Sequence, residues 1–275
     1  MAFVNEENIP SPPSAGIAVP RWRWYVHLFL IGGFFIPGIA FSLKHVHRSA
    51  ALGKTAGGLL AVSALHLAIF ALIYGLGCLA SRATREQLFL PWRPGWLVLP
   101  LGIAYSIAVR VVVAIAALTV VVILLLTHVV TKESIQHFKP TKYLDVEKLV
   151  DKSAMESHGA YFWLTVTVVS FIVAGLREEL WRAGTLAAMR ALWPRAFGTR
   201  LGEVGAVIII AIVFGAAHLP MGILPAAIAG LLGILLGLII LLHRSVWPAV
   251  LAHGFFDALS LALIPLVLQK LQHGP

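Results

Sequence analysis

The sequence predicts an all-α fold, a polytopic transmembrane helical bundle with seven or eight spans. The chain has 275 residues, of which 59% are hydrophobic and only 12% charged, and its mean hydropathy of +0.90 lies well above that of an ordinary soluble domain. The apolar stretches are continuous, without the alternation of a transmembrane β-strand, and most approach the roughly 20 residues that a spanning helix needs. They are residues 24–43, 57–80, 97–130, 160–176, 204–219, 222–242 and 246–268.

The third of these stretches leaves the number of spans open. It is too long for one span and contains Arg110, so its beginning, "WLVLPLGIAYSIAV", is expected to form a separate short helix if the count is eight. Before the first span, the proline-rich and acidic N-terminus lacks the basic start of a signal peptide and is expected to be a disordered lead-in. The predicted parts are the lead-in (1–23), the N-terminal transmembrane helices (24–130), an extramembrane insert (131–159) and a C-terminal transmembrane core (160–270).

The insert at 131–159 balances lysines with acidic residues. Within it, "KYLDVEKLVDKSAM" places Tyr143, Val146, Leu149 and Val150 on one helical face, which predicts a short amphipathic helix on the membrane or on the bundle. A solvated connector is the alternative.

The net charge of +9 does not indicate nucleic-acid binding. The basic residues are spread through the loops between apolar stretches, where contact with anionic lipid headgroups explains them. Cys78 is the single cysteine, so an intrachain disulfide is excluded. The partners expected from composition are therefore the lipid bilayer and membrane-associated molecules, and no nucleic acid.

Ionisable residues enter the apolar stretches mainly in the second half of the chain. Each costs about 2.5 to 3.5 kcal/mol at the centre of a bilayer, so they must be paired, protonated or in contact with water. Three pairs, one of which joins a histidine to a phenylalanine, have a spacing of four residues, which places both side chains on one face of a helix. The pairs are Glu178 and Arg182, Phe214 and His218 in "FGAAH", and His253 and Asp257 in "HGFFD".

Taken singly, each pair is more simply explained as an ion pair or as an interfacial histidine. Together they predict one polar group of side chains from three helices around a wet intramembrane cavity. Carboxylates and histidines can activate water for attack on a carbonyl carbon and stabilise the resulting oxyanion. Glu178, His218 and His253 are also the set that would bind a divalent metal such as zinc, but a metal-free site is preferred.

The three motifs resemble those of the CAAX protease and bacteriocin-processing (CPBP) family of intramembrane proteases, which includes type II CAAX prenyl endopeptidases and bacteriocin-immunity (Abi) proteins. The family pattern is EExxxR, FxxxH and HxxxN/D on three membrane helices. Here the matching segments are "EELWRAG" at 178–184, "FGAAH" at 214–218 and "HGFFD" at 253–257. The resemblance covers roughly residues 155–270 and marks residues 160–270 as the catalytic core.

The resemblance implies a role for each motif residue. Glu178 would be the general base assisted by His218, with His253 and Asp257 around the oxyanion and Glu179 as a supporting carboxylate. Arg182 stands one residue earlier than the family arginine, a position from which its side chain can still contact either glutamate. Which glutamate it neutralises is therefore left open.

The function expected is that of an intramembrane endopeptidase acting on a membrane-anchored and possibly lipidated protein or peptide. The alternatives are an ion- or proton-coupled transporter and a non-catalytic immunity or binding member of the same family. The Ala-rich and Arg-rich composition suggests a prokaryotic cell membrane.

Overall fold

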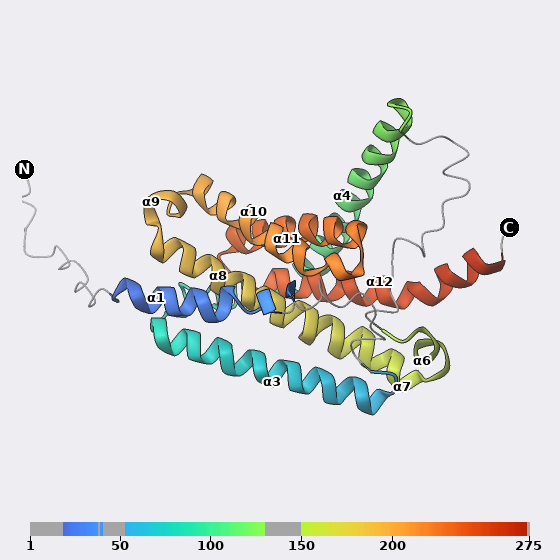
Figure 1. Cartoon of the computed structure of the whole chain (residues 1–275), viewed down its shortest axis with the longest axis horizontal. Helices are drawn as coiled ribbons and strands as arrows, with labels where there is room; N and C mark the ends of the chain where they lie inside the picture. The colour runs from blue at the N-terminus through green and yellow to red at the C-terminus, as the bar shows by residue number, and fades with distance from the viewer. Residues whose placement is uncertain (1–18, 38, 41–52, 130–149, 274–275) are drawn as a thin grey trace, which may run out of the picture.

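The computed structural model describes residues 19–37, 39–40, 53–129 and 150–273 (Figure 1). All regular structure in these ranges is helical, which confirms the predicted all-α class. The elements are α1 (Arg21–His27), the π-helix η2 (Leu28–Gly32), α3 (Ala56–Ser81), η3 (Gly95–Leu97), α4 (Val98–Leu126), α6 (Lys152–Ser157), α7 (Gly159–Leu164), the π-helix η6 (Thr165–Leu176), α8 (Arg177–Leu192), α9 (Pro194–Phe197), α10 (Arg200–Ala217), η7 (Leu219–Met221), α11 (Ile223–His243) and α12 (Trp247–His273).

Several of these helices have the length and composition of membrane spans, as expected for an integral membrane protein. A further apolar helix, Trp247–Leu263, is shorter than these candidate spans. Among the described residues, five segments are long and apolar enough to cross a membrane: Ala56–Ser81, Gly95–Leu126, Gly159–Leu192, Arg200–Ala217 and Ile223–His243.

The predicted count of seven or eight spans is not confirmed. The apolar stretch at 24–43 begins as α1 and η2, but the regular helix ends at Gly32 and a turn follows at 33–35. The expectation of a separate short helix at the start of 97–130 is wrong, because α4 runs as one helix of 29 residues. Arg110 does not interrupt α4, because its guanidinium finds oxygen partners on α4 itself and on α12.

Most of the predicted amphipathic helix at 142–155 lies outside the described residues. The part that is described includes α6, which begins after Asp151. The Asp151 carboxylate accepts a hydrogen bond from the Ala154 N–H at 2.9 Å, a common way to begin a helix. This backbone hydrogen bond holds the pKa of Asp151 below its usual range.

The helices that carry the polar motifs pack side by side. α7, η6 and α8 follow one another as a single rod, and α12 packs against η6 on one side and α4 on the other (Figure 1). α10 and α11 are joined by the short η7 and pack on each other. α10 also contacts α8, so residues far apart in the sequence meet near the junction of η6 and α8.

Two glycines allow the rod and α12 to approach closely. A methyl group at Gly175 would lie 2.8 Å from the carbonyl oxygen of Val250 and 3.4 Å from the backbone nitrogen of Gly254. A methyl group at Gly254 would overlap the ring of Phe171. Small residues at such crossings let membrane helices pack backbone to backbone. The crossing lies three residues before Glu178 and next to His253, so it sets the separation of these two side chains.

We therefore predict that Gly175→Ala pushes α12 away from the rod. The contact to be relieved is a backbone carbonyl, which cannot rotate aside, and overpacking of this kind costs typically about 1–3 kcal/mol. Thermal unfolding in detergent should show the loss. Gly159→Ala is the matched control on the same rod, because a methyl group there meets nothing within 4 Å. Equal stability of the two variants would contradict the importance of this crossing.

Candidate functional site

Glu178 and Glu179 lie in the first turn of α8, directly after the π-helix η6. Both residues are buried, with 8% and 0% of their surface exposed. Adjacent residues on an α-helix point about 100° apart, so the two carboxylates reach different partners. Arg177 Nη2 donates to Glu178 Oε1 at 2.8 Å, whereas Glu179 Oε2 pairs with Nη1 of Arg182.

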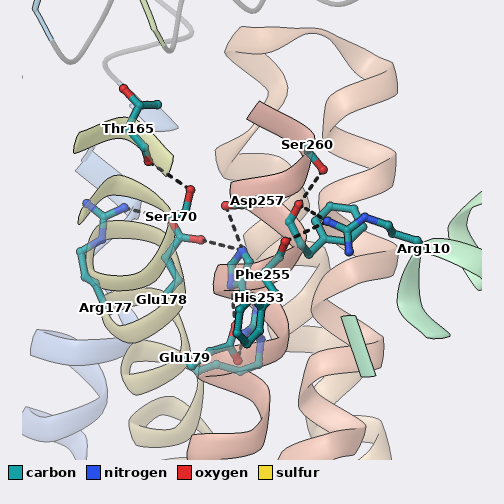
Figure 2. Close-up of polar contacts among 12 residues, drawn as sticks. Arg110, Thr165, Ser170, Arg177, Glu178, Glu179, His253, Phe255, Asp257 and Ser260 are labelled. Carbon is teal, nitrogen blue, oxygen red and sulfur yellow. Dashed lines mark hydrogen bonds and ion pairs between the residues drawn. The ribbon is translucent and has the colours of Figure 1, made fainter. Parts of the chain in front are cut away.

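His253 on α12 lies between the carboxylates (Figure 2). Its Nδ1 is 2.9 Å from Glu179 Oε1, and because an ionised carboxylate only accepts, Nδ1 carries the proton. On the other side of the ring, Nε2 lies 3.9 Å from Glu178 Oε2 and 3.6 Å from Asp257 Oδ2. One buried imidazole thus faces three carboxylates from two helices.

The four side chains differ in their access to the outside. Counting side-chain atoms alone, the exposed fractions are 0% for Glu179, 3% for His253, 10% for Glu178 and 27% for Asp257. Asp257 is therefore the open edge of the group and Glu179 its closed end.

Arg182 is fully buried at the closed end of the group. Besides pairing with Glu179, its guanidinium lies 4.7 Å from the centre of the Phe214 ring, a cation–π contact. The buried pair of Glu179 and Arg182 resolves the question that the sequence leaves open, because Arg182 neutralises Glu179 and leaves Glu178 to Arg177.

Arg110 on α4 approaches the group from the other side of α12. Its Nη2 donates to the carbonyl oxygens of Phe255 and Phe256, at 2.9 and 2.6 Å, and its Nη1 donates to Ser106 on its own helix (Figure 2). Arg110 also interacts electrostatically with Asp257. Each carboxylate of the group therefore has an arginine as its counter-charge.

His218 ends α10 and lies at the edge of the group. Its Nδ1 is 2.8 Å from the Phe214 carbonyl oxygen. This carbonyl can only accept, so Nδ1 carries a proton, and in the neutral imidazole Nε2 is then an acceptor. The Phe214 ring packs against both histidines, with its centre 4.7 Å from His218 and 6.4 Å from His253. His218 interacts electrostatically with Asp257, but no hydrogen bond within the described residues joins it to either glutamate.

The structure thus brings together most of the side chains selected from the sequence, while their roles stay predictions. Glu178, Glu179, Arg182, His253 and Asp257 lie in one group, with Phe214 packed against it and His218 at its edge. Arg177 and the contribution of Arg110 were not predicted from the sequence. For Arg110 there was a signal, because a charge inside an apolar stretch requires a partner.

Across the described ranges, no three His, Cys, Asp or Glu side chains are grouped so that they could hold an ion. Of the two histidines that the sequence offers as metal ligands, His253 is hydrogen-bonded through Nδ1 to Glu179, and His218 is hydrogen-bonded through Nδ1 to a backbone carbonyl. The two Nε2 atoms remain, and the Phe214 ring packs against both histidines.

Comparison with known families identifies the C-terminal part of the chain. Residues 160–259 match the family model described as type II CAAX prenyl endopeptidase Rce1-like. Searches of curated proteins and of solved structures found no match. The matched region runs from α7 to α12 and includes both glutamates, both histidines and Asp257. Over residues 160–259 the chain is therefore similar to the Rce1-like type II CAAX prenyl endopeptidases.

Proposed function

We propose that the chain is an intramembrane endopeptidase that hydrolyses a peptide bond of a membrane-associated protein near the bilayer surface, with Glu178 activating the water and no metal ion involved. The family match supports a protease acting on membrane-associated proteins. The observation that carries the mechanism is the grouping of Glu178 and Asp257 within 4 Å of the Nε2 atom of one buried histidine.

The water is proposed to lie between Glu178, Asp257 and His253 Nε2. The distances of 3.9 and 3.6 Å from Nε2 to the carboxylates exceed a direct hydrogen bond and suit bridging by a water molecule. Glu178 is the better base of the two glutamates because its second oxygen, Oε2, faces this space. Both oxygens of Glu179 are engaged, one by Arg182 and one by His253.

The reaction then follows from these positions. Glu178 takes one proton from the water as the water oxygen bonds to the carbonyl carbon of the substrate, which leaves a negative charge on the carbonyl oxygen. His253, held by Glu179 and protonated on both nitrogens, donates from Nε2 to that oxygen. Collapse of the intermediate breaks the C–N bond, and Glu178 returns its proton to the leaving nitrogen.

His218 is assigned an assisting role. In the neutral imidazole its Nε2 is an acceptor, since Nδ1 carries the proton donated to the Phe214 carbonyl. It shares the open edge of the site with Asp257, where it would orient the substrate or the water. Asp257, with Arg110 as counter-charge, is proposed to orient the Nε2 side of His253.

The substrate class and compartment rest on narrower support. The family description names prenyl endopeptidases, which favours a lipidated protein as substrate. The expectation of a prokaryotic cell membrane rests on composition alone.

We predict that Glu178→Gln lowers peptide cleavage by about 10²–10⁴-fold, the usual contribution of a general base. Release of a C-terminal peptide from a membrane-anchored substrate in proteoliposomes measures this. Glu86→Gln is the control, because Glu86 is an exposed partner of Arg93 far from the group. Full activity of Glu178→Gln would contradict the proposed mechanism. If the protein cleaves no peptide but carries a solute flux, and Asp257→Asn changes that flux, the transporter would be favoured. Folded protein with neither property would favour the non-catalytic alternative.

Glu179→Gln is predicted to act differently, by weakening the fold. The change leaves the buried Arg182 charge without a counter-charge, and removing one partner of a buried pair costs about 3–5 kcal/mol. Glu178→Gln should cost clearly less, because its partner Arg177 is not fully buried. Thermal unfolding of the two variants side by side tests this. Unfolding midpoints that drop more in Glu178→Gln would mean that the assignments of the two glutamates are reversed.

The metal-free mechanism predicts that activity survives rigorous removal of metals. Cleavage should keep its rate after treatment with a zinc-selective chelator and dialysis, with metal content followed by elemental analysis. The control is the untreated enzyme carried through the same dialysis. Inactivation that added zinc reverses, with about one equivalent bound per chain, would replace this mechanism with a metal-dependent one.

A further inference from the structure

One end of the bundle gathers arginines from segments that lie far apart in the sequence. It is the left end in Figure 1, where α1 and α10 begin and where α3 and α8 end. Hydrogen bonds fasten these segments together. Arg21 Nη2 donates to the Leu192 carbonyl oxygen at the end of α8, at 2.7 Å, and the Val246 N–H donates to the Phe89 carbonyl oxygen in the loop after α3, at 2.8 Å. The basic residues of this end therefore belong to one connected surface.

Four arginines of this surface are exposed and form no ion pair with a carboxylate of the described residues. Arg82 follows α3 directly, and Arg85 lies in the loop after it. Arg195 belongs to α9, and Arg200 is the first residue of α10. We call these four residues the arginine face. Their charges are held at the surface without a counter-charge from the described part of the chain.

The acidic residues of this end are engaged elsewhere. Glu203, which is 2% exposed, accepts from Nη1 and Nη2 of Arg244 at 2.6 and 2.8 Å, and Nε of Arg190 lies 2.9 Å from one of its oxygens. Glu86 accepts from Arg93 at 3.0 Å. Two guanidinium groups on one buried carboxylate leave a positive charge fixed in place, because Glu203 stands in the first turn of α10, which begins at the arginine face.

The kind of cation at this end points to phosphate as the ligand. All described lysines and arginines at this end are arginines, whereas Lys54 and Lys152 lie at the opposite end, where α3 and α6 begin. There, Lys54 interacts electrostatically with Asp151. A guanidinium group presents its donors in a planar fork that fits two phosphate oxygens at once, while an ammonium group acts as a point charge.

Exposed tryptophans place the same surface at the level of lipid headgroups. Trp22 on α1, Trp92 in the loop after α3 and Trp96 in η3 are exposed by 63%, 49% and 78%. Tryptophan is enriched at the membrane–water interface, where its ring meets both headgroups and hydrocarbon. Phosphate that reaches an arginine at this depth belongs to a lipid headgroup, so a lipid is favoured over a soluble polyanion.

We propose that the arginine face binds the phosphate groups of anionic phospholipids in preference to those of zwitterionic ones. The choline group of a zwitterionic lipid carries a positive charge that the arginines repel, while an anionic headgroup carries none. From the sequence, all basic loops are equal candidates for lipid contact. The structure selects this surface, because its arginines are exposed, unpaired and surrounded by interfacial tryptophans. The proposal does not depend on peptide hydrolysis.

Photocrosslinking of the full-length protein in phosphatidylcholine vesicles tests the proposal. One arm contains a trace of phosphatidylglycerol with a diazirine at the start of an acyl chain, close to the headgroup. The other arm contains phosphatidylcholine with the same diazirine. Adducts are located by mass spectrometry. We expect phosphatidylglycerol to label residues 82–94 and 193–200 more than phosphatidylcholine does by roughly fivefold or more, the attraction of about one arginine to an anionic lipid.

Two variants of the arginine face divide charge from geometry. Arg→Gln at all four positions removes the charges and should lower phosphatidylglycerol labelling of these segments by about tenfold or more. Arg→Lys at the same positions keeps the charges but removes the bidentate contacts, so its labelling should lie between that of the Gln variant and wild type. The control is Lys54→Gln with Lys152→Gln, which removes charge from the opposite end and should leave the labelling unchanged. Thermal unfolding in detergent checks that the variants are folded.

The outcomes bear on this surface alone. Equal labelling by the two lipids in the wild type, or a loss of labelling that is as large in the control as in the Gln variant, would overturn the proposal. Labelling of the Lys variant equal to wild type would overturn the part that rests on bidentate contacts. Retention of a soluble RNA by the detergent-solubilised protein, without preference between the lipids, would assign the surface to a soluble polyanion instead. Selective labelling of a protein that cleaves no peptide would uphold the lipid surface and refute only the peptidase.

Discussion

A carboxylate among membrane helices needs a positive partner, and this requirement organises the whole domain. Glu178 has Arg177, Glu179 has Arg182, and Asp257 has Arg110 within electrostatic range. The imidazole of His253 joins the three pairs into one group. Ions placed in this setting without partners would destabilise a protein by several kcal/mol each. The arrangement keeps several ionisable groups close together in a place where an unpaired charge is costly.

The two glutamates gain different properties from the same turn of helix. Glu179 and Arg182 are buried completely and fix the position of the histidine, as a supporting carboxylate commonly does in hydrolytic sites. Glu178 keeps one oxygen facing the open side of the ring. The difference arises from the roughly 100° step between neighbouring helical residues, and from the glycine crossing that brings α12 close enough for one ring to meet both side chains.

Much of this site was predictable from residue types and spacing, because ionisable groups in apolar helices must find one another. On this ground Glu178, Glu179, His253 and Asp257 were predicted to be neighbours, and they are. The same argument could not assign Arg182, because spacings of three and four residues both permit contact, and the contact with Glu179 is decided by how α8 packs against α10 and α12. The ion pair of Arg177 with Glu178 was not predicted, because adjacent residues rarely face each other on a regular helix.

The errors in the fold have similar causes. Hydropathy measures how apolar a stretch is, but not whether its backbone continues as a helix. The first apolar stretch breaks at Gly32, while α4 continues through Arg110 because oxygen atoms on α12 satisfy the guanidinium. Neither outcome is encoded locally. Both depend on tertiary neighbours, which a window of sequence does not contain.

The Phe214 ring has a consequence for how such a domain can change over evolutionary time. It is 1% exposed and touches Arg182, both histidines and Trp181. A mutation that enlarges or tilts this ring therefore disturbs the Arg182 guanidinium, the two imidazoles and the Trp181 indole together. Drift at this one position is constrained by four neighbours at once.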